Sequence, residues 1–143
     1  MLFRSERRLL ELDWDTGAVT PFVDLEAAST SNRLNDGCCD SSGRFVVGSM
    51  CADTNAGRTT GTLHRIHHSG EVETLRTHIG VTNGLAFDVT RNRMYFADTP
   101  TERVLVFDYE PSTGALSNQR LFFDYHEYPG KPAGASVESH GRS

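Results

Sequence analysis

The sequence predicts an all-β fold, and more narrowly part of a β-propeller with about three blades of four-stranded antiparallel sheet. Turn signals recur every 22 to 27 residues along the chain. They are centred near Gly17, Gly43, Gly70, Asn92, Gly114 and Gly141. No helical apolar period lasts long enough to indicate a helix, and 13 glycines with 37% hydrophobic residues suit a turn-rich β protein. Two turns per blade then give about three blades, fewer than the four to eight of a closed propeller.

One design occurs three times, each time as a polar or small residue before a glycine and an extended segment after it. The three copies align on Gly37, Gly84 and Gly134. Their spacing of 47 and 50 residues matches the period of propeller blades. Asp36, Asn83 and Ala133 directly precede these glycines. Equivalent strands of successive blades would place the three residues at equivalent positions beside the central channel.

Between the turns, short apolar segments predict the individual strands. The expected strands are 8–13, 18–23, a short strand after Gly37, 44–50, 62–66, 71–75, 83–88, 93–98, 103–109 and 116–123. Three leucines give 8–13 its apolar surface, and 103–109 alternates as a half-buried strand does. The intervening segments 24–32, 51–60, 76–82 and 124–131 are expected to be loops or connections.

Composition excludes several classes of protein. The formal net charge is −5 with no basic stripe, so nucleic acid is not an expected partner. No apolar run approaches the roughly 20 residues needed to cross a membrane, and residues 1–8 lack the apolar core of a secretion signal. Three cysteines, with Cys38 and Cys39 adjacent, make a poor disulfide framework. This cysteine usage fits a reducing compartment, and we expect a cytoplasmic location.

Several motifs, in order, resemble one known family. RLNDG at 33–37 with DSSGR at 40–44 resembles the R-x-N-D-G…D-x-x-G-R signature of the SMP-30/regucalcin/gluconolactonase family. GSM at 48–50 is similar to its G-T-M, and TNGL at 82–85 is similar to its S-N-G-L. GKPAG at 130–134 occupies the place of its G-x-P-D-G. The resemblance covers nearly the whole chain.

The resemblance implies a six-bladed propeller of about twice this length, of which 1–143 would lack the first and the last blades. It also implies hydrolysis of sugar lactones, specifically aldonolactones, with one divalent cation (Ca²⁺, Zn²⁺, Mn²⁺ or Mg²⁺) at the propeller axis. By the same resemblance, Asn83 is a metal ligand. The resemblance also makes Arg33, Asn35 and Asp53 substrate contacts. The repeat alignment separately predicts that Arg33 and Asn35 face the same central opening as Asn83.

Two departures from the family pattern weaken the expected activity. The family's catalytic Asp of P-D-G is Ala133 here, and the first-blade Glu that binds the metal has no counterpart. The resemblance therefore implies a weakened metal site and impaired hydrolysis. The alternative is a non-catalytic propeller fragment that binds calcium or another ligand. An incomplete ring exposes edge strands and apolar faces, which favours self-association to complete the ring.

Ordinary structural roles are the alternative for the same residues. Asn83 could be a turn residue in left-handed geometry, Arg33 a solvated loop arginine, and Asn35-Asp36-Gly37 a simple Asx turn. Three histidines lie close together in the sequence at positions 64, 67 and 68. His64 and His68 would lie across a strand end without a carboxylate partner, so surface histidines are expected rather than metal ligands.

Overall fold

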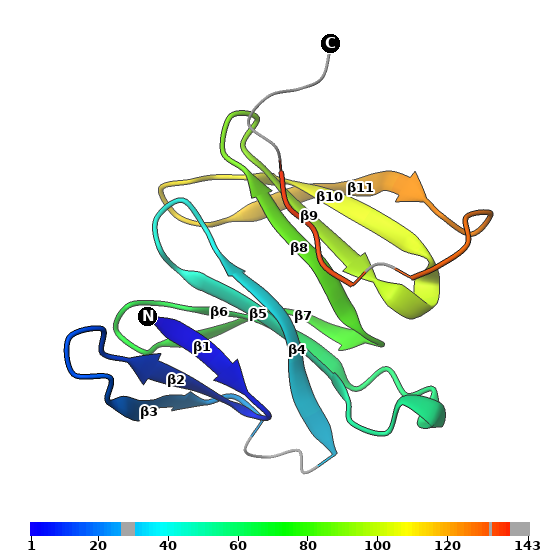
Figure 1. Cartoon of the computed structure of the whole chain (residues 1–143). Helices are drawn as coiled ribbons and strands as arrows, with labels where there is room; N and C mark the ends of the chain where they lie inside the picture. The colour runs from blue at the N-terminus through cyan, green and yellow to red at the C-terminus, as the bar shows by residue number, and fades with distance from the viewer. Residues whose placement is uncertain (27–30, 132, 138–143) are drawn as a thin grey trace.

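The computed structural model describes residues 1–26, 31–131 and 133–137, and it is all-β as the sequence predicts. Three antiparallel sheets follow one another along the chain (Figure 1). The first sheet contains β1 (Leu2–Ser5), β2 (Arg8–Leu12) and β3 (Val19–Asp24). The second contains β4 (Asn32–Cys39), β5 (Phe45–Cys51), β6 (Gly61–Ile66) and β7 (Val72–Ile79). The third contains β8 (Thr82–Asp88), β9 (Arg93–Asp98), β10 (Arg103–Tyr109) and β11 (Leu116–Asp124).

Within each sheet, every strand pairs with its neighbour in sequence, so each sheet is a simple meander, as in a propeller blade. Five expected turn centres have positive φ, from 50° at Asn92 to 85° at Gly70. The sixth, Gly141, lies outside the described residues. Among the described residues, none of the helices has the length and apolar character needed to cross a membrane.

The structure corrects the sequence analysis at several element boundaries. β1 was not expected, because LFRS carries too short an apolar pattern to stand out as a strand. β4 begins at Asn32, so the polar head of the second sheet is itself part of a strand. β7 continues to Ile79 through the segment expected to be a connection. Two short 3-10 helices, η1 (Thr54–Ala56) and η2 (Thr99–Thr101), follow β5 and β9.

The two middle strands of the second sheet are buried on both faces: every residue of β5 is buried and so is nearly all of β6, whereas β7 is mostly exposed. Successive side chains of a strand point to opposite faces. Phe45 and Val47 accordingly join Leu9 and Ile66 in a cluster with the first sheet. Val46 joins a larger cluster with the third sheet. That larger cluster also contains Leu63, Ile79, Leu85, Met94, Phe96 and Tyr109.

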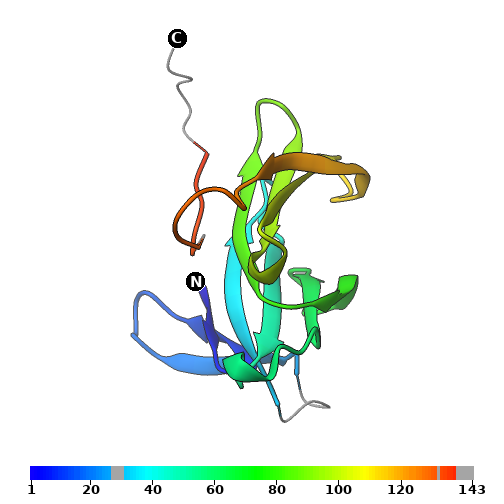
Figure 2. The same cartoon turned by 90° about the vertical axis from the view of Figure 1, so that its right-hand side faces the viewer.

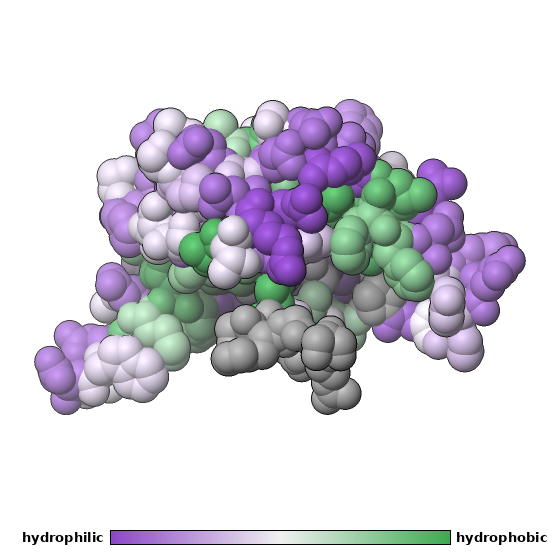
Figure 3. Space-filling view, turned by 90° about the horizontal axis from the view of Figure 1, so that it is seen from above, coloured by the Kyte–Doolittle hydropathy of each residue, from purple (hydrophilic) through white to green (hydrophobic). Residues whose placement is uncertain are grey.

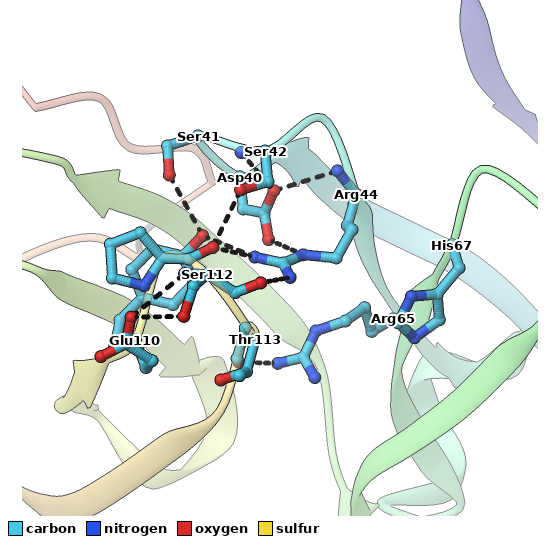
Figure 4. A network of polar contacts seen from close by, with 12 residues as sticks. Asp40, Ser41, Ser42, Arg44, Arg65, His67, Glu110, Ser112 and Thr113 are labelled. Carbon is cyan, nitrogen blue, oxygen red and sulfur yellow. Dashed lines mark hydrogen bonds and ion pairs between the residues drawn. The ribbon is translucent and has the colours of Figure 1, made fainter.

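Arg44 and Asp40 form a buried ion pair at the hairpin turn of the second sheet (Figure 4). Hydrogen bonds from Arg44 join this turn to the hairpin turn of the third sheet. Arg44 donates from Nε to Asp40 Oδ2 at 2.6 Å, and from Nη2 to the Tyr109 hydroxyl at 3.1 Å. It also donates to the carbonyl oxygens of Pro111 at 2.6 Å and Ser112 at 3.2 Å. Burial raises the pKa of Asp40, but the hydrogen bonds from Arg44 and from backbone N–H groups outweigh it and leave the pKa below its ordinary value. We call this set the Arg44 latch.

The outer face of the third sheet is apolar and open. Phe122 and Phe123 near the end of β11 are exposed, and apolar surface gathers on the side of the molecule where β11 ends (Figure 3). A hollow of about 390 Å³ lies on this face between Tyr95, Val104 and Phe122. Ala135, Ser136 and Val137 line one side of the hollow. The segment that carries them runs beside β8 (Figure 2).

Candidate functional site

The candidate site forms where the first strands of the second and third sheets meet. The register of β4 against β5 shifts between Leu34 and Gly37, and the register of β8 against β9 shifts between Asn83 and Ala86. Bulges of this kind redirect side chains and are common next to active sites. Here the two bulges lie opposite each other, so polar side chains of β4 reach the backbone and side chains of β8.

A chain of hydrogen bonds runs across this junction. Arg33 Nη1 donates to Asn35 Oδ1 at 3.0 Å, and Asn35 Nδ2 donates to Asn83 Oδ1 at 3.0 Å. Asn35 Nδ2 also donates to the Thr82 carbonyl at 2.9 Å. Asn83 Nδ2 donates to Thr99 Oγ1 at 2.7 Å. The structure thus brings Arg33, Asn35 and Asn83 together in one network, while their roles toward metal and substrate stay predictions.

The ordinary structural roles do not describe these residues. Asn83 is buried within β8 and is absent from the residues with positive φ; Gly84, with φ +58°, takes the left-handed position instead. Arg33 is half-buried and hydrogen-bonded rather than solvated. The Asp36 carboxylate does more than close a local turn, because it accepts from Leu85 N of β8 at 3.0 Å as well as from Gly37 N.

Asp53 lies apart from this network. It caps η1 by accepting from Asn55 N at 3.1 Å, and it is exposed. It shares a small cavity with Arg58, Val81 and Pro100, beside η2. No hydrogen bond joins it to any of the other predicted site residues in the described part of the chain. Its predicted contact with substrate stays a prediction.

The third copy of the repeat lies near the first two but is not paired as a strand. Ala133 is exposed, and no strand is assigned within 133–137. The segment nevertheless passes the start of β8, because a Cβ at Gly84 would stand 3.7 Å from the Ala135 Cβ. The continuation of this copy beyond residue 137 lies outside the described residues.

The described residues offer one amide oxygen, that of Asn83, as a ligand for a cation, but no group of carboxylates beside it. Asn83 Oδ1 accepts one hydrogen bond, so a second lone pair remains for a hard cation such as Ca²⁺ or Mg²⁺. Within 1–26, 31–131 and 133–137, no group of three His, Cys, Asp or Glu residues could hold a metal ion. Asn83 therefore fits as one ligand of a divalent cation, and the described residues add no cluster of anionic ligands to it.

Two features of the structure were missed from the sequence. Thr99 ends the hydrogen-bond chain, yet nothing in the sequence pairs it with Asn83. The expectation that His64 is a surface residue without a carboxylate was wrong: His64 is buried in β6, and its Nε2 lies 3.9 Å from Glu26 Oε1. Burial lowers the pKa of His64, which Glu26 opposes only in part. Glu26 is 38 residues earlier in the chain, so no local pattern could reveal this contact.

Comparison with known proteins gives consistent matches. The family described as SMP-30/Gluconolactonase/LRE-like region matches residues 1–143. The chain is 38% identical over 133 residues to the pentonolactonase XacC of Haloferax volcanii, covering 89% of this chain and 44% of that protein. It is 27% identical to Xenopus laevis regucalcin, covering 92% of this chain and 45% of that protein. The chain thus spans less than half the length of these curated relatives.

Solved structures show the same architecture. A luciferin-regenerating enzyme has a TM-score of 0.87 and 32% identity, covering 96% of this chain and 48% of that one. Regucalcin from Agrobacterium tumefaciens, described as a calcium-binding protein, has a TM-score of 0.87 and 27% identity, covering 98% and 47%.

Proposed function

The chain belongs to the SMP-30/gluconolactonase/LRE-like family, and we propose on that basis that it supplies part of the site of a divalent-metal-dependent sugar lactonase. The hydrogen-bond chain that joins Arg33, Asn35 and Asn83 is the observation that supports this most directly. The relative named pentonolactonase supports a lactone as the substrate class. The chain covers less than half of that relative and of Xenopus laevis regucalcin, which fits a part of the ring, and we propose from the order of the motifs that 1–143 corresponds to the middle blades.

The proposed division of labour follows from the side-chain chemistry. A lactone opens when water adds to the carbonyl carbon and the ring C–O bond breaks, with the ring oxygen taking up a proton. A bound divalent cation supplies a Lewis acid for the carbonyl and lowers the pKa of water. Arg33 presents a rigid fork of donors to sugar oxygens, and Asn35, which already accepts from Arg33, holds that fork in place.

The absent base limits the reaction. At the family's Asp position, the Ala133 methyl group can neither bind a cation nor accept a proton. The Asp36 carboxylate accepts hydrogen bonds from the backbone N–H groups of Gly37 in β4 and Leu85 in β8, and so it bridges the two strands. The described residues place no cluster of anionic ligands around Asn83, which favours the second candidate function, a non-catalytic propeller region that binds calcium or another ligand weakly.

Calorimetry with Ca²⁺, Mn²⁺ and Zn²⁺, together with a lactone-hydrolysis assay with and without metal, tests both functions. We expect weak cation binding and little hydrolysis from the unmodified chain. Ala133→Asp should raise cation affinity, because ligand charge strongly affects affinity. Ser136→Asp, in the same exposed segment, is the matched control and should not. Tight binding by the unmodified chain that Ala133→Asp leaves unchanged would put the metal elsewhere.

Two further properties stay predictions. Self-association is supported by the open apolar face of the third sheet, with Phe122 and Tyr95 at its surface. Light scattering measures it directly. A cytoplasmic location is supported by three cysteines, all of them free.

A further inference from the structure

We propose that Thr99 is a positioning residue that fixes the side-chain amide of Asn83, so that the Asn83 oxygen faces the junction between β4 and β8. This inference deepens the proposed function, because that oxygen is the proposed metal ligand. Thr99 lies at the first position of η2, directly after β9, and is buried. Its hydroxyl oxygen stands 2.7 Å from Asn83 Nδ2.

Arg33, at the other end of the chain of hydrogen bonds from Thr99, sets which atom donates and which accepts in each bond. Arg33 can only donate, so the Asn35 atom that faces it is the oxygen. The Asn35 nitrogen then faces Asn83 and the Thr82 carbonyl, which can only accept. The Asn83 atom that faces Asn35 must be its oxygen, and the nitrogen turns to Thr99. Thr99 therefore completes the single arrangement in which every amide group is paired.

The backbone holds the Thr99 hydroxyl in place independently of Asn83. Thr99 N donates to the Val81 carbonyl at 3.0 Å. The Thr99 carbonyl accepts from the Tyr125 hydroxyl at 3.1 Å and from Glu102 N at 3.1 Å. Exchange of the hydroxyl for a methyl group leaves these three bonds intact. It leaves the buried Asn83 nitrogen without its acceptor, and the amide loses the contact that opposes its rotation.

The variants separate orientation from folding. Thr99→Val removes the hydroxyl at constant shape, and Thr99→Ser restores it. Thr101→Val is the matched control, because Thr101 Oγ1 donates to the Asp98 carbonyl in the same short helix but does not touch Asn83. NMR of the metal-free chain follows the exchange of the Asn83 Nδ2 protons with water. A Mn²⁺ titration, read by paramagnetic broadening of the signals near Asn83, follows cation affinity.

In Thr99→Val we expect the Asn83 amide protons to exchange about tenfold faster, the effect of one lost hydrogen bond. Loss of an orienting partner should also weaken Mn²⁺ binding about 10- to 100-fold. Thr99→Ser and Thr101→Val should match the unmodified chain in both measurements. Unchanged amide exchange in Thr99→Val would overturn the inference. If the unmodified chain binds no Mn²⁺ near Asn83, the proposed metal site fails, and the amide exchange alone decides the role of Thr99.

Discussion

The Arg44 latch gives a quantitative prediction about how the second and third sheets hold together. Arg44→Met removes four side-chain hydrogen bonds and leaves the Asp40 carboxylate, whose side chain is fully buried, without its cation. Breaking a buried ion pair from one side costs about 3–5 kcal/mol. Asp40 keeps backbone donors from Ser42 and residue 44, so we expect the lower end, about 3 kcal/mol.

Urea denaturation of the two forms measures this cost as a lower midpoint with unchanged slope. Arg8→Met is the matched control, since Arg8 and Asp24 form an ion pair at 3.0 Å with side chains 51% and 57% exposed. It should cost less than about 1 kcal/mol. The Asp40→Asn/Arg44→Met double variant should recover part of the loss, because it removes the unpaired charge. Equal midpoints for Arg44→Met and Arg8→Met would refute the reasoning.

The pH dependence of the same pair has a defined sign. The folded pKa of Asp40 lies below its ordinary value, so the unfolded chain binds the proton first as pH falls. The stability that Asp40 contributes is present above this value and is lost as pH falls through the folded pKa. In Arg44→Met, burial still raises the pKa of Asp40, but the hydrogen bond from the Arg44 side chain no longer lowers it. The acid-induced loss of stability near pH 4 should therefore shrink in this variant.

Two further predictions concern buried positions. The unfolded chain takes up a proton at His64 near pH 6.5, while burial keeps the folded form neutral, so stability should fall as pH drops below that value. His64→Gln should flatten this slope in thermal melts between pH 5 and 8, and an unaltered slope would contradict the assignment. Glu102 raises the pKa of the exposed His126, so His126 contributes stability that is present at low pH and is lost as pH rises. His126→Gln should therefore make the loss of stability at low pH steeper. Gly48→Ala should destabilise by about 1–3 kcal/mol or more, because its Cβ would lie 2.1 Å from the buried Thr82 Oγ1. Gly134→Ala, with nothing within 4 Å, should leave the denaturation midpoint unchanged, and equal midpoints for the two variants would show that Thr82 moves aside freely.

The turns and central strands could be predicted from sequence because their signals are local. Gly17, Gly43 and Gly70 mark hairpin turns by residue type, and each has a positive φ in the structure. β1 could not be predicted in the same way, since its four residues depend on pairing with β2 for their conformation. The extension of β7 to Ile79 depends likewise on pairing with Gly61 at the start of β6.

Only those residues of the candidate site that belong to the sequence repeat could be predicted. Asn35 and Asn83 are 48 residues apart, and the blade period alone suggests that they occupy neighbouring positions. Thr99 has no counterpart in the repeat alignment, because it enters the site through η2 after β9 rather than from an innermost strand. The contact between His64 and Glu26 joins β6 to the residue that lies two positions after β3, and no periodic pattern records such a pairing.

Three separate kinds of interaction cross the junction between the second and third sheets. The Arg44 latch lies at the hairpin end, the cluster around Phe96 fills the middle, and the chain from Arg33 to Thr99 lies at the opposite end. The first contains a buried ion pair and the second consists of buried apolar side chains, so we expect these two to contribute most to holding the sheets together. The third consists mainly of neutral amides, whose net contribution to stability is small but whose directions are fully specified. A variant at Arg44 should therefore change stability while leaving the Asn83 amide oriented. Thr99→Val should disturb the orientation of that amide at a smaller cost in stability, which comes from the unpaired Asn83 nitrogen.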